Sequence, residues 1–191
     1  INIDDSYGLI LSNQIELPHQ SVSRTNKSAD WFYKKIDFQK SEYNIEINKP
    51  LTIIGENYPV IDGELKGEII TIVSDHVVVD GLFIINVGTS YTEDFAAIRV
   101  KRSKYFEIKN LVLEKLFFGI YLEKAANGKV YHNKIIGDAV TEHNSGNAIQ
   151  LWYCRNITIE NNIVQHVRDG IYLEFSDNCI IKNNVSTNNL R

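Results

Sequence analysis

The sequence predicts an all-β protein, a right-handed parallel β-helix with rungs of about 22 residues. One phrase, a small residue followed by isoleucine, a variable residue and an aliphatic residue, returns four times. It occupies 97–100, 119–122, 148–151 and 170–173, so that its isoleucines are 22, 29 and 22 residues apart. A second phrase keeps the same spacing at 108–111, 130–133, 159–162 and 181–184. Two short strands that recur at a fixed period are typical of a solenoid.

Within each phrase apolar and polar residues alternate, as expected for a short strand with one buried face. Ile98, Val100 and their counterparts are predicted to point into the core. A single rung cannot bury this face alone, so the rungs must stack with their strands paired in parallel. The one seven-residue excess (29 against 22) indicates a loop, over 137–146, that leaves the register intact on either side.

Turns are expected where asparagine and glycine follow a strand, because these residues tolerate left-handed backbone. The Asn161-Asn162 and Asn183-Asn184 pairs occupy the same place in successive rungs. Asparagines in register can also hydrogen-bond along the stack as a ladder. His132 falls at the turn position of this ladder and is predicted to be a structural substitute.

The repeat is expected to begin before the first clear phrase, because 51–55, 60–63 and 79–82 resemble earlier strands. We therefore predict five or six turns over residues 46–191. Residues 1–45 show no rung phrase and are predicted to form an N-terminal cap, a degenerate rung or an irregular lead-in. The final residues 188–191 stop in mid-rung without a polar cap, so we expect a chain truncated at one or both ends.

Composition excludes several classes of protein. The net charge is −4 and no basic cluster appears, so nucleic acid is not an expected partner. No run of 18 apolar residues exists, so no membrane span is expected in this chain. Cys154 and Cys179 form no Cys-x-x-Cys motif, and free thiols are the default, although a disulfide stays open.

Several stretches resemble the NosD-type maturation proteins of nitrous oxide reductase, β-helices of the carbohydrate-binding and sugar-hydrolase (CASH) repeat type. Residues 168–176, Arg-Asp-Gly-Ile-Tyr-Leu-Glu-Phe-Ser, carry the most specific part of the resemblance. Further similar stretches are 49–56, 59–63, 118–122, 146–153 and 189–191.

The resemblance implies a periplasmic accessory factor without enzymatic activity. Such a protein works with an ABC transporter, receives copper from a copper chaperone and helps to assemble the copper sites of nitrous oxide reductase. Copper is then the expected cofactor, and no cofactor is expected to be required for folding. The fold alone does not license these conclusions, because β-helices host many functions.

Copper(I) prefers soft ligands, and the chain has no methionine, so a copper site here would rest on histidine and cysteine. His143 and His166 lie six and five residues before the isoleucines of their rungs, which places them on the same edge of adjacent turns. Glu142 is next to the first of them. We therefore predict a metal pair, with two exposed loop histidines as the alternative.

The outward face of the first strand carries two columns of side chains. The first is Arg99, Tyr121, Gln150 and Tyr172, and the second is Lys101, Glu123, Trp152 and Glu174, with Tyr153 following Trp152. Aromatic residues on an outer face indicate a partner surface or a sugar platform, or they are covered by the inserted loop. Arg168 and Asp169, just before a strand, belong either to the turn or to a docking surface.

A carbohydrate-active β-helix, whether hydrolase, lyase, epimerase or sugar-binding module, is the rival interpretation. Glu123 and Glu174 are two rungs apart, which puts their stems roughly 10 Å apart, near the carboxylate spacing of inverting glycosidases. Trp152 between them is suited to stacking on a sugar ring. Against this interpretation, nothing in the sequence raises the pKa of one carboxyl to make a general acid.

Overall fold

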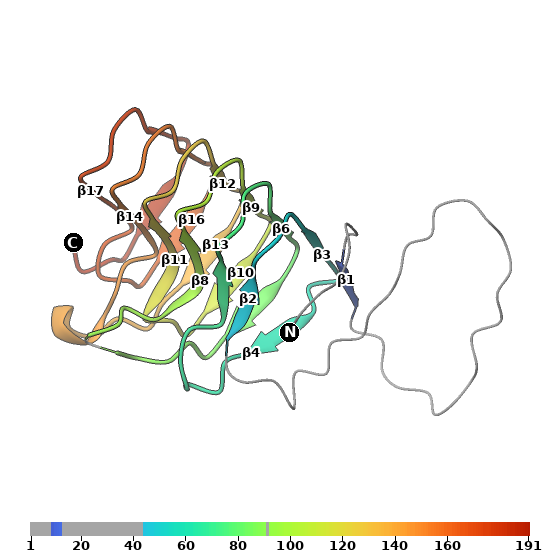
Figure 1. Ribbon diagram of the computed structural model, residues 1–191. Helices are drawn as coiled ribbons and strands as arrows, with labels where there is room; N and C mark the ends of the chain where they lie inside the picture. Colours follow the sequence, from blue (N-terminus) through green and yellow to red (C-terminus); the bar gives the residue numbers. More distant parts are fainter. Residues whose placement is uncertain (1–8, 13–43, 91) are drawn as a thin grey trace, which may run out of the picture.

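The computed structural model describes residues 9–12, 44–90 and 92–191 and shows six turns of a parallel β-helix (Figure 1). Each turn contributes one strand to each of three parallel sheets. The first sheet holds β2 (Ile45–Ile47), β5 (Ile70–Ile72), β8 (Ala96–Lys101), β11 (Phe118–Glu123), β14 (Ile149–Trp152) and β17 (Ile171–Glu174).

The second sheet holds β1 (Leu9–Ser12), β3 (Thr52–Glu56), β6 (Val78–Asp80), β9 (Glu107–Lys109), β12 (Lys129–Tyr131), β15 (Thr158–Glu160) and β18 (Ile180–Lys182). The third sheet holds β4 (Val60–Asp62), β7 (Phe83–Ile85), β10 (Val112–Glu114), β13 (Lys134–Ile136), β16 (Ile163–Gln165) and β19 (Val185–Thr187). A 3-10 turn, η1 (Glu142–Asn144), lies between β13 and β14. The described residues include no helix long and apolar enough to cross a lipid bilayer.

The predicted fold class is confirmed by the register of the first sheet. The isoleucines of the first phrase stand opposite one another on neighbouring strands, at Ile98, Ile120, Ile149 and Ile171. The predicted lead-in over residues 1–45 lies almost wholly outside the described residues. Within it, β1 pairs in parallel with β3 and so extends the second sheet.

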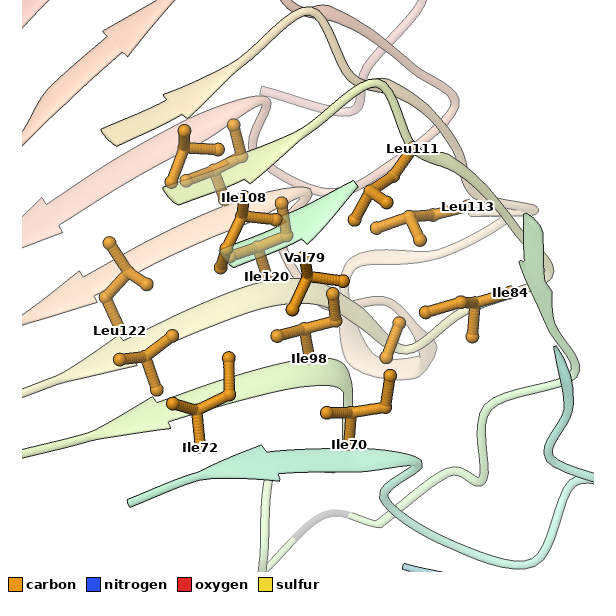
Figure 2. Close-up of a cluster of buried hydrophobic side chains, with 14 of the residues drawn as sticks. Ile70, Ile72, Val79, Ile84, Ile98, Ile108, Leu111, Leu113, Ile120 and Leu122 are labelled. Atoms are coloured by element: carbon orange, nitrogen blue, oxygen red, sulfur yellow. The ribbon is translucent and has the colours of Figure 1, made fainter. Parts of the chain in front are cut away.

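The core is a set of apolar columns that run along the stack (Figure 2). Ile70, Ile98 and Ile120 form one column from the first sheet, and each is at most 1% exposed. Val79 and Ile108 face them from the second sheet. Fully burying one such side chain stabilises the fold by about 1.5–3 kcal/mol, so the columns provide most of the stability of the stack.

Two kinds of asparagine share the corner between the second and third sheets. The first residue of each Asn-Asn pair has left-handed backbone, with φ of 57° at Asn161 and 55° at Asn183. The second residue points inward and forms the predicted ladder. Nδ2 of Asn133 donates to Oδ1 of Asn162 at 3.0 Å, and Nδ2 of Asn162 donates to Oδ1 of Asn184 at 2.9 Å. His132 has φ of 55° and therefore replaces the turn asparagine, not the ladder one.

Replacing Asn162 by alanine is expected to lower the free energy of unfolding by about 3 kcal/mol, because several buried groups lose their partners at roughly 1–3 kcal/mol each. The Asn162 amide also donates to the Val130 carbonyl and accepts from the Asn133 N–H. Urea unfolding followed by circular dichroism measures the loss. The matched control is Asn161→Gly, which keeps the left-handed backbone and should change stability little. Equal stability of Asn162→Ala and the wild type would contradict the ladder's role.

Candidate functional site

A groove lies at the corner where the chain passes from the third sheet to the first. Two connections at this corner are long, over 86–95 and 137–148, and the connection between them, over 115–117, has three residues. The long connections stand on either side of the short one, along the outward face of β11, β14 and β17. They frame a groove of about 390 Å³. Its lining residues are Asp94, Phe117, Phe118, Tyr121, Glu142, His143, Gln150, Arg168, Tyr172 and Glu174.

Three residues in register on the first sheet form the floor of this groove. Tyr121 pairs with Gln150, and Gln150 pairs with Tyr172, on neighbouring strands. Gln150 is buried, and its Oε1 accepts a hydrogen bond from Nδ2 of Asn147 at 2.5 Å. Tyr172 is 41% exposed. The predicted outward column is therefore present, and the inserted loop walls the groove without closing over Tyr172.

The groove is acidic. Three carboxylates, Asp94, Glu142 and Glu174, line it against the single arginine Arg168. Burial raises the pKa of Tyr121, and the nearby carboxylate of Asp94 raises it further. The Glu174 carboxylate also raises the pKa of Tyr121, whereas the Arg99 guanidinium lowers it. A negative field of this kind favours cationic ligands and disfavours anionic ones.

Arg99 occupies the end of the groove beyond Tyr121. Its Nε donates to Oε2 of Glu68 at 2.5 Å, and its guanidinium lies 4.3 Å from the centre of the Tyr121 ring. Nη2 donates to the carbonyls of Glu93 at 3.2 Å and Asp94 at 2.7 Å, which ties the first long loop to the sheet. The Arg99 side chain is 11% exposed, so this cation stabilises the fold and is not accessible to a ligand.

Arg168 and Asp169 form an ion pair with each other, at 3.0 Å between Nε and Oδ2. The Asp169 N–H donates to Oδ1 of Asn147, and the Arg168 N–H donates to the Gly146 carbonyl. These backbone bonds hold the turn in place, and the choice between a turn role and a docking role for the Asp169 carboxylate stays a prediction. Arg168 also lines the groove, so its predicted docking role stays a prediction.

The predicted histidine pair is placed on two different segments. His143 lies in η1 and lines the groove beside Glu142. His166 is exposed at the turn after β16, with φ of 54°, and its carbonyl accepts from the Ala139 N–H. The register therefore sets His166 beside Ala139, because the loop that carries His143 is extruded from the stack. Glu142 hydrogen-bonds Arg191, which lowers the pKa of this carboxyl.

Across 9–12, 44–90 and 92–191, no group of three or more His, Cys, Asp or Glu side chains is arranged to hold a metal ion. Both cysteines are free. Cys154 is buried, its Sγ lies 3.3 Å from the Leu122 carbonyl, and burial raises the pKa of its thiol to about 11. Copper is bound by the thiolate, so this thiol is poorly prepared as a ligand. Copper binding at His143 and His166 stays a prediction.

The two carboxylates of the rival interpretation stand in different surroundings. Glu123 and Glu174 flank Trp152 in register, as expected. Glu123 lies 3.8 Å from Arg99 and 4.0 Å from Lys101. Lys124 covers the Trp152 ring at 4.8 Å, where a sugar would have to stack. The Glu123 side chain is 15% exposed, so it offers little open approach to a sugar.

Tyr153 lies at the corner between the first and second sheets, outside the groove. Its ring stacks on Phe175 with centroids 4.7 Å apart, and it meets Trp152 edge to face at 4.8 Å. Tyr153 and Phe175 both have left-handed backbone, with φ of 52° and 50°, and are 50% and 65% exposed. This aromatic cluster is separate from the floor formed by Tyr121 and Tyr172.

The sequence did not reveal that Asp94, Phe117 and Phe118 belong to the site. A signal was present in the sequence. Val79 and Ile108 occupy the same position in successive rungs but are 29 residues apart, which indicates a second long loop. Only the three-dimensional structure shows that both long loops border the same face of the first sheet. Phe118 packs against Tyr121 with centroids 5.4 Å apart, which joins the corner to the floor.

The fold and site define a β-solenoid protein with a ligand-sized groove on one outer sheet face. Within this class, the chain belongs to the NosD family, because residues 10–191 match the family described as "Periplasmic copper-binding protein (NosD)". The resemblance on which the sequence analysis relied is thereby confirmed.

A relative in Pseudomonas aeruginosa, named "Probable ABC transporter binding protein NosD", is 33% identical over 129 residues. The match covers 66% of this chain and 30% of that relative. A solved structure from Parabacteroides merdae, described as a "putative glycosyl hydrolase", superimposes with a TM-score of 0.54 at 14% identity. It covers 75% of this chain and 77% of its own, and at this identity the likeness shows the fold alone.

Arg99→Gln is expected to lower the free energy of unfolding by about 3 kcal/mol, because removing one partner of a largely buried ion pair leaves uncompensated charge. Glu68 and Glu123 would keep their carboxylates with 13% and 15% of the side chain exposed. Thermal unfolding measures the effect, and the exposed Arg155 supplies the matched control Arg155→Gln. A loss no larger than that of the control would show that the Arg99 cluster is dispensable.

The Cys154 thiol is expected to resist alkylation at pH 8, because only the thiolate reacts and its pKa is raised to about 11. Raising the pH towards that value should increase the reactive fraction. Iodoacetamide labelling of Cys179→Ser, which keeps only Cys154, is compared by mass spectrometry with Cys154→Ser. Both variants should label at similar rates in urea. Equal rates in the folded proteins would contradict the predicted protection.

Proposed function

We propose that this chain is part of a periplasmic, non-enzymatic accessory factor that assists copper delivery and copper-site assembly in nitrous oxide reductase. The family match over residues 10–191 carries the proposal, since the family is described as periplasmic and copper-binding. The name of the P. aeruginosa relative supports an ABC transporter as partner. The chain spans about 30% of that relative, so the activity and partners of the whole protein are part of the proposal.

The groove on the first sheet is the part of this chain that we assign to partner contact. It combines exposed Tyr172 with Glu174 and Arg168, and protein interfaces favour aromatic and arginine side chains of this kind. Because the groove lies between two long loops on the first sheet, contact with a partner there leaves the other two sheets undisturbed. A copper chaperone and the reductase itself are the further partners that we propose.

Copper, if this part of the protein holds it, is assigned to His143 and His166, with Glu142 as a further donor. Imidazole nitrogen is an accepted copper ligand, and the chain offers no methionine and one protected thiol. His143 and His166 lie on two connections at the same corner, the inserted loop and the turn after β16. The 3-10 turn of the inserted loop has no buried residue, so the loop has little packing to lose when it adjusts to a shared ion.

The proposal predicts that cells lacking the gene export nitrous oxide reductase that has lost most of its copper. Copper per reductase polypeptide is measured by mass spectrometry on the purified enzyme, and restoring the gene is the control. In parallel, Cu(I) competition with a chromophoric chelator compares the wild type with His143→Ala/His166→Ala. A reductase with its full copper content in the deletion strain would refute the accessory role.

A further inference from the structure

One pentapeptide, Gly-Ile-Tyr-Leu-Glu, occurs twice on the outward-facing first sheet. It occupies 119–123 on β11 and 170–174 at the start of β17, with β14 between them. In both copies the tyrosine and the glutamate are two residues apart, so both side chains point outward. The two copies therefore present the same pair of groups, an aromatic ring beside a carboxylate, at two places on one face.

The first copy already binds a guanidinium. Arg99 stands on the preceding strand directly opposite Tyr121 in register. Its guanidinium carbon lies 4.3 Å from the centre of the Tyr121 ring, and its Nη1 lies 3.8 Å from Oε2 of Glu123. A cation over an aromatic face and an adjacent carboxylate reinforce each other, and arginine suits such a site because its planar group both stacks and donates.

The second copy has the same two groups without the cation. The residue opposite Tyr172 on the preceding strand is Gln150, which is neutral, buried and hydrogen-bonded to Asn147. Among the described residues, no arginine or lysine lies over the Tyr172 ring. Arg168 is close by but is paired with Asp169 at 3.0 Å. In the first copy, the Arg99 side chain fills the corresponding position and is 11% exposed.

The surroundings of the second copy suit a cation that arrives from outside. Tyr172 and Glu174 line the groove of about 390 Å³, which has room for one long side chain and its flanking backbone. Asp94 and Glu142 add two further carboxylates to its walls. At its edge, Glu142 already hydrogen-bonds a second arginine of the chain, Arg191. The two arginines in and beside the groove are thus both held by carboxylates.

We propose that Tyr172 and Glu174 bind an arginine side chain carried by an extended segment of a partner protein. The guanidinium stacks on the Tyr172 ring and pairs with the Glu174 carboxylate, as that of Arg99 does with Tyr121 and Glu123. The inference rests on the proposed partner role of the groove and gives that role its chemistry. It requires no metal ion and no movement of the inserted loop.

The test is titration of the ¹⁵N-labelled protein with the peptide acetyl-Gly-Arg-Gly-amide, followed by NMR. The amides of β14 and β17 should shift, and the citrulline peptide, which lacks the charge, should bind at least about tenfold more weakly, a difference of about 1.4 kcal/mol. Glu174→Gln and Tyr172→Leu should each weaken the arginine peptide to a similar extent. Glu114→Gln, which alters an outward carboxylate of the third sheet, is the matched control and should bind like the wild type.

A second variant tests the comparison between the two copies. Gln150→Arg places an arginine at the position equivalent to Arg99 and is expected to fill the site and exclude the peptide. Because Gln150 is buried, this variant is interpreted only if its circular dichroism spectrum and melting temperature match the wild type. Glu174→Gln and Tyr172→Leu, at more exposed positions, keep the proposal testable otherwise.

Equal binding of the arginine and citrulline peptides, or undiminished binding by Glu174→Gln, would overturn the inference. A lysine peptide as tight as the arginine peptide would overturn the guanidinium assignment. Shifts at the same amides with a neutral oligosaccharide, and none with the arginine peptide, would make the groove a sugar site. The peptide test is independent of reductase copper content, so failure of the inference and failure of the proposed function are distinguishable.

Discussion

Every feature of this protein depends on the parallel pairing of each strand with its counterpart one rung away. The pairing brings residues 22 or 29 positions apart face to face, so one side chain repeats its environment on the next rung. Apolar residues then form continuous columns, and Asn133, Asn162 and Asn184 form a continuous hydrogen-bonded ladder. A slip of one residue would turn the columns outward and break the ladder together, which is why the register is so strongly specified.

The groove is a consequence of the same pairing. Extra residues cannot enter a strand without breaking the register, so they leave the stack at corners. Two of the longest connections between strands, over 86–95 and 137–148, occur at the same corner, and one rung with a short connection lies between them. The short rung leaves Tyr121 at the bottom of a depression, and the long loops contribute Asp94, Glu142 and His143 to its sides. A rigid stack with loops at one corner thus makes a binding surface without altering the core.

The charged residues on this face fall into two groups, one that holds the structure together and one that lines the groove. At one end, Arg99 pairs with Glu68 and Glu123, and Lys101 lies 4.0 Å from Glu123; Arg99 and both carboxylates are largely buried. Towards β17, Tyr172 and Glu174 line the groove, and in the part of the chain that the structure describes no arginine or lysine lies over the Tyr172 ring. A paired-carboxylate mechanism would need open access to Glu123 and Glu174, and Lys124 covers the Trp152 ring that lies between them. The family to which the chain belongs is described as periplasmic and copper-binding.

The sequence by itself determined the period, the strands, the inward and outward columns and the asparagine turns, because side-chain alternation and rung spacing are local or strictly periodic properties. It also placed Tyr121, Gln150, Tyr172 and Glu174 on one face. Only the tertiary structure decided that Asp94, Phe117 and Phe118 join them, and that His143 lies in the groove while His166 stands beside Ala139. The paths of the loops are not periodic: they are set by packing at the corner and by contacts such as Arg99 with the Asp94 carbonyl, which no spacing along the chain encodes.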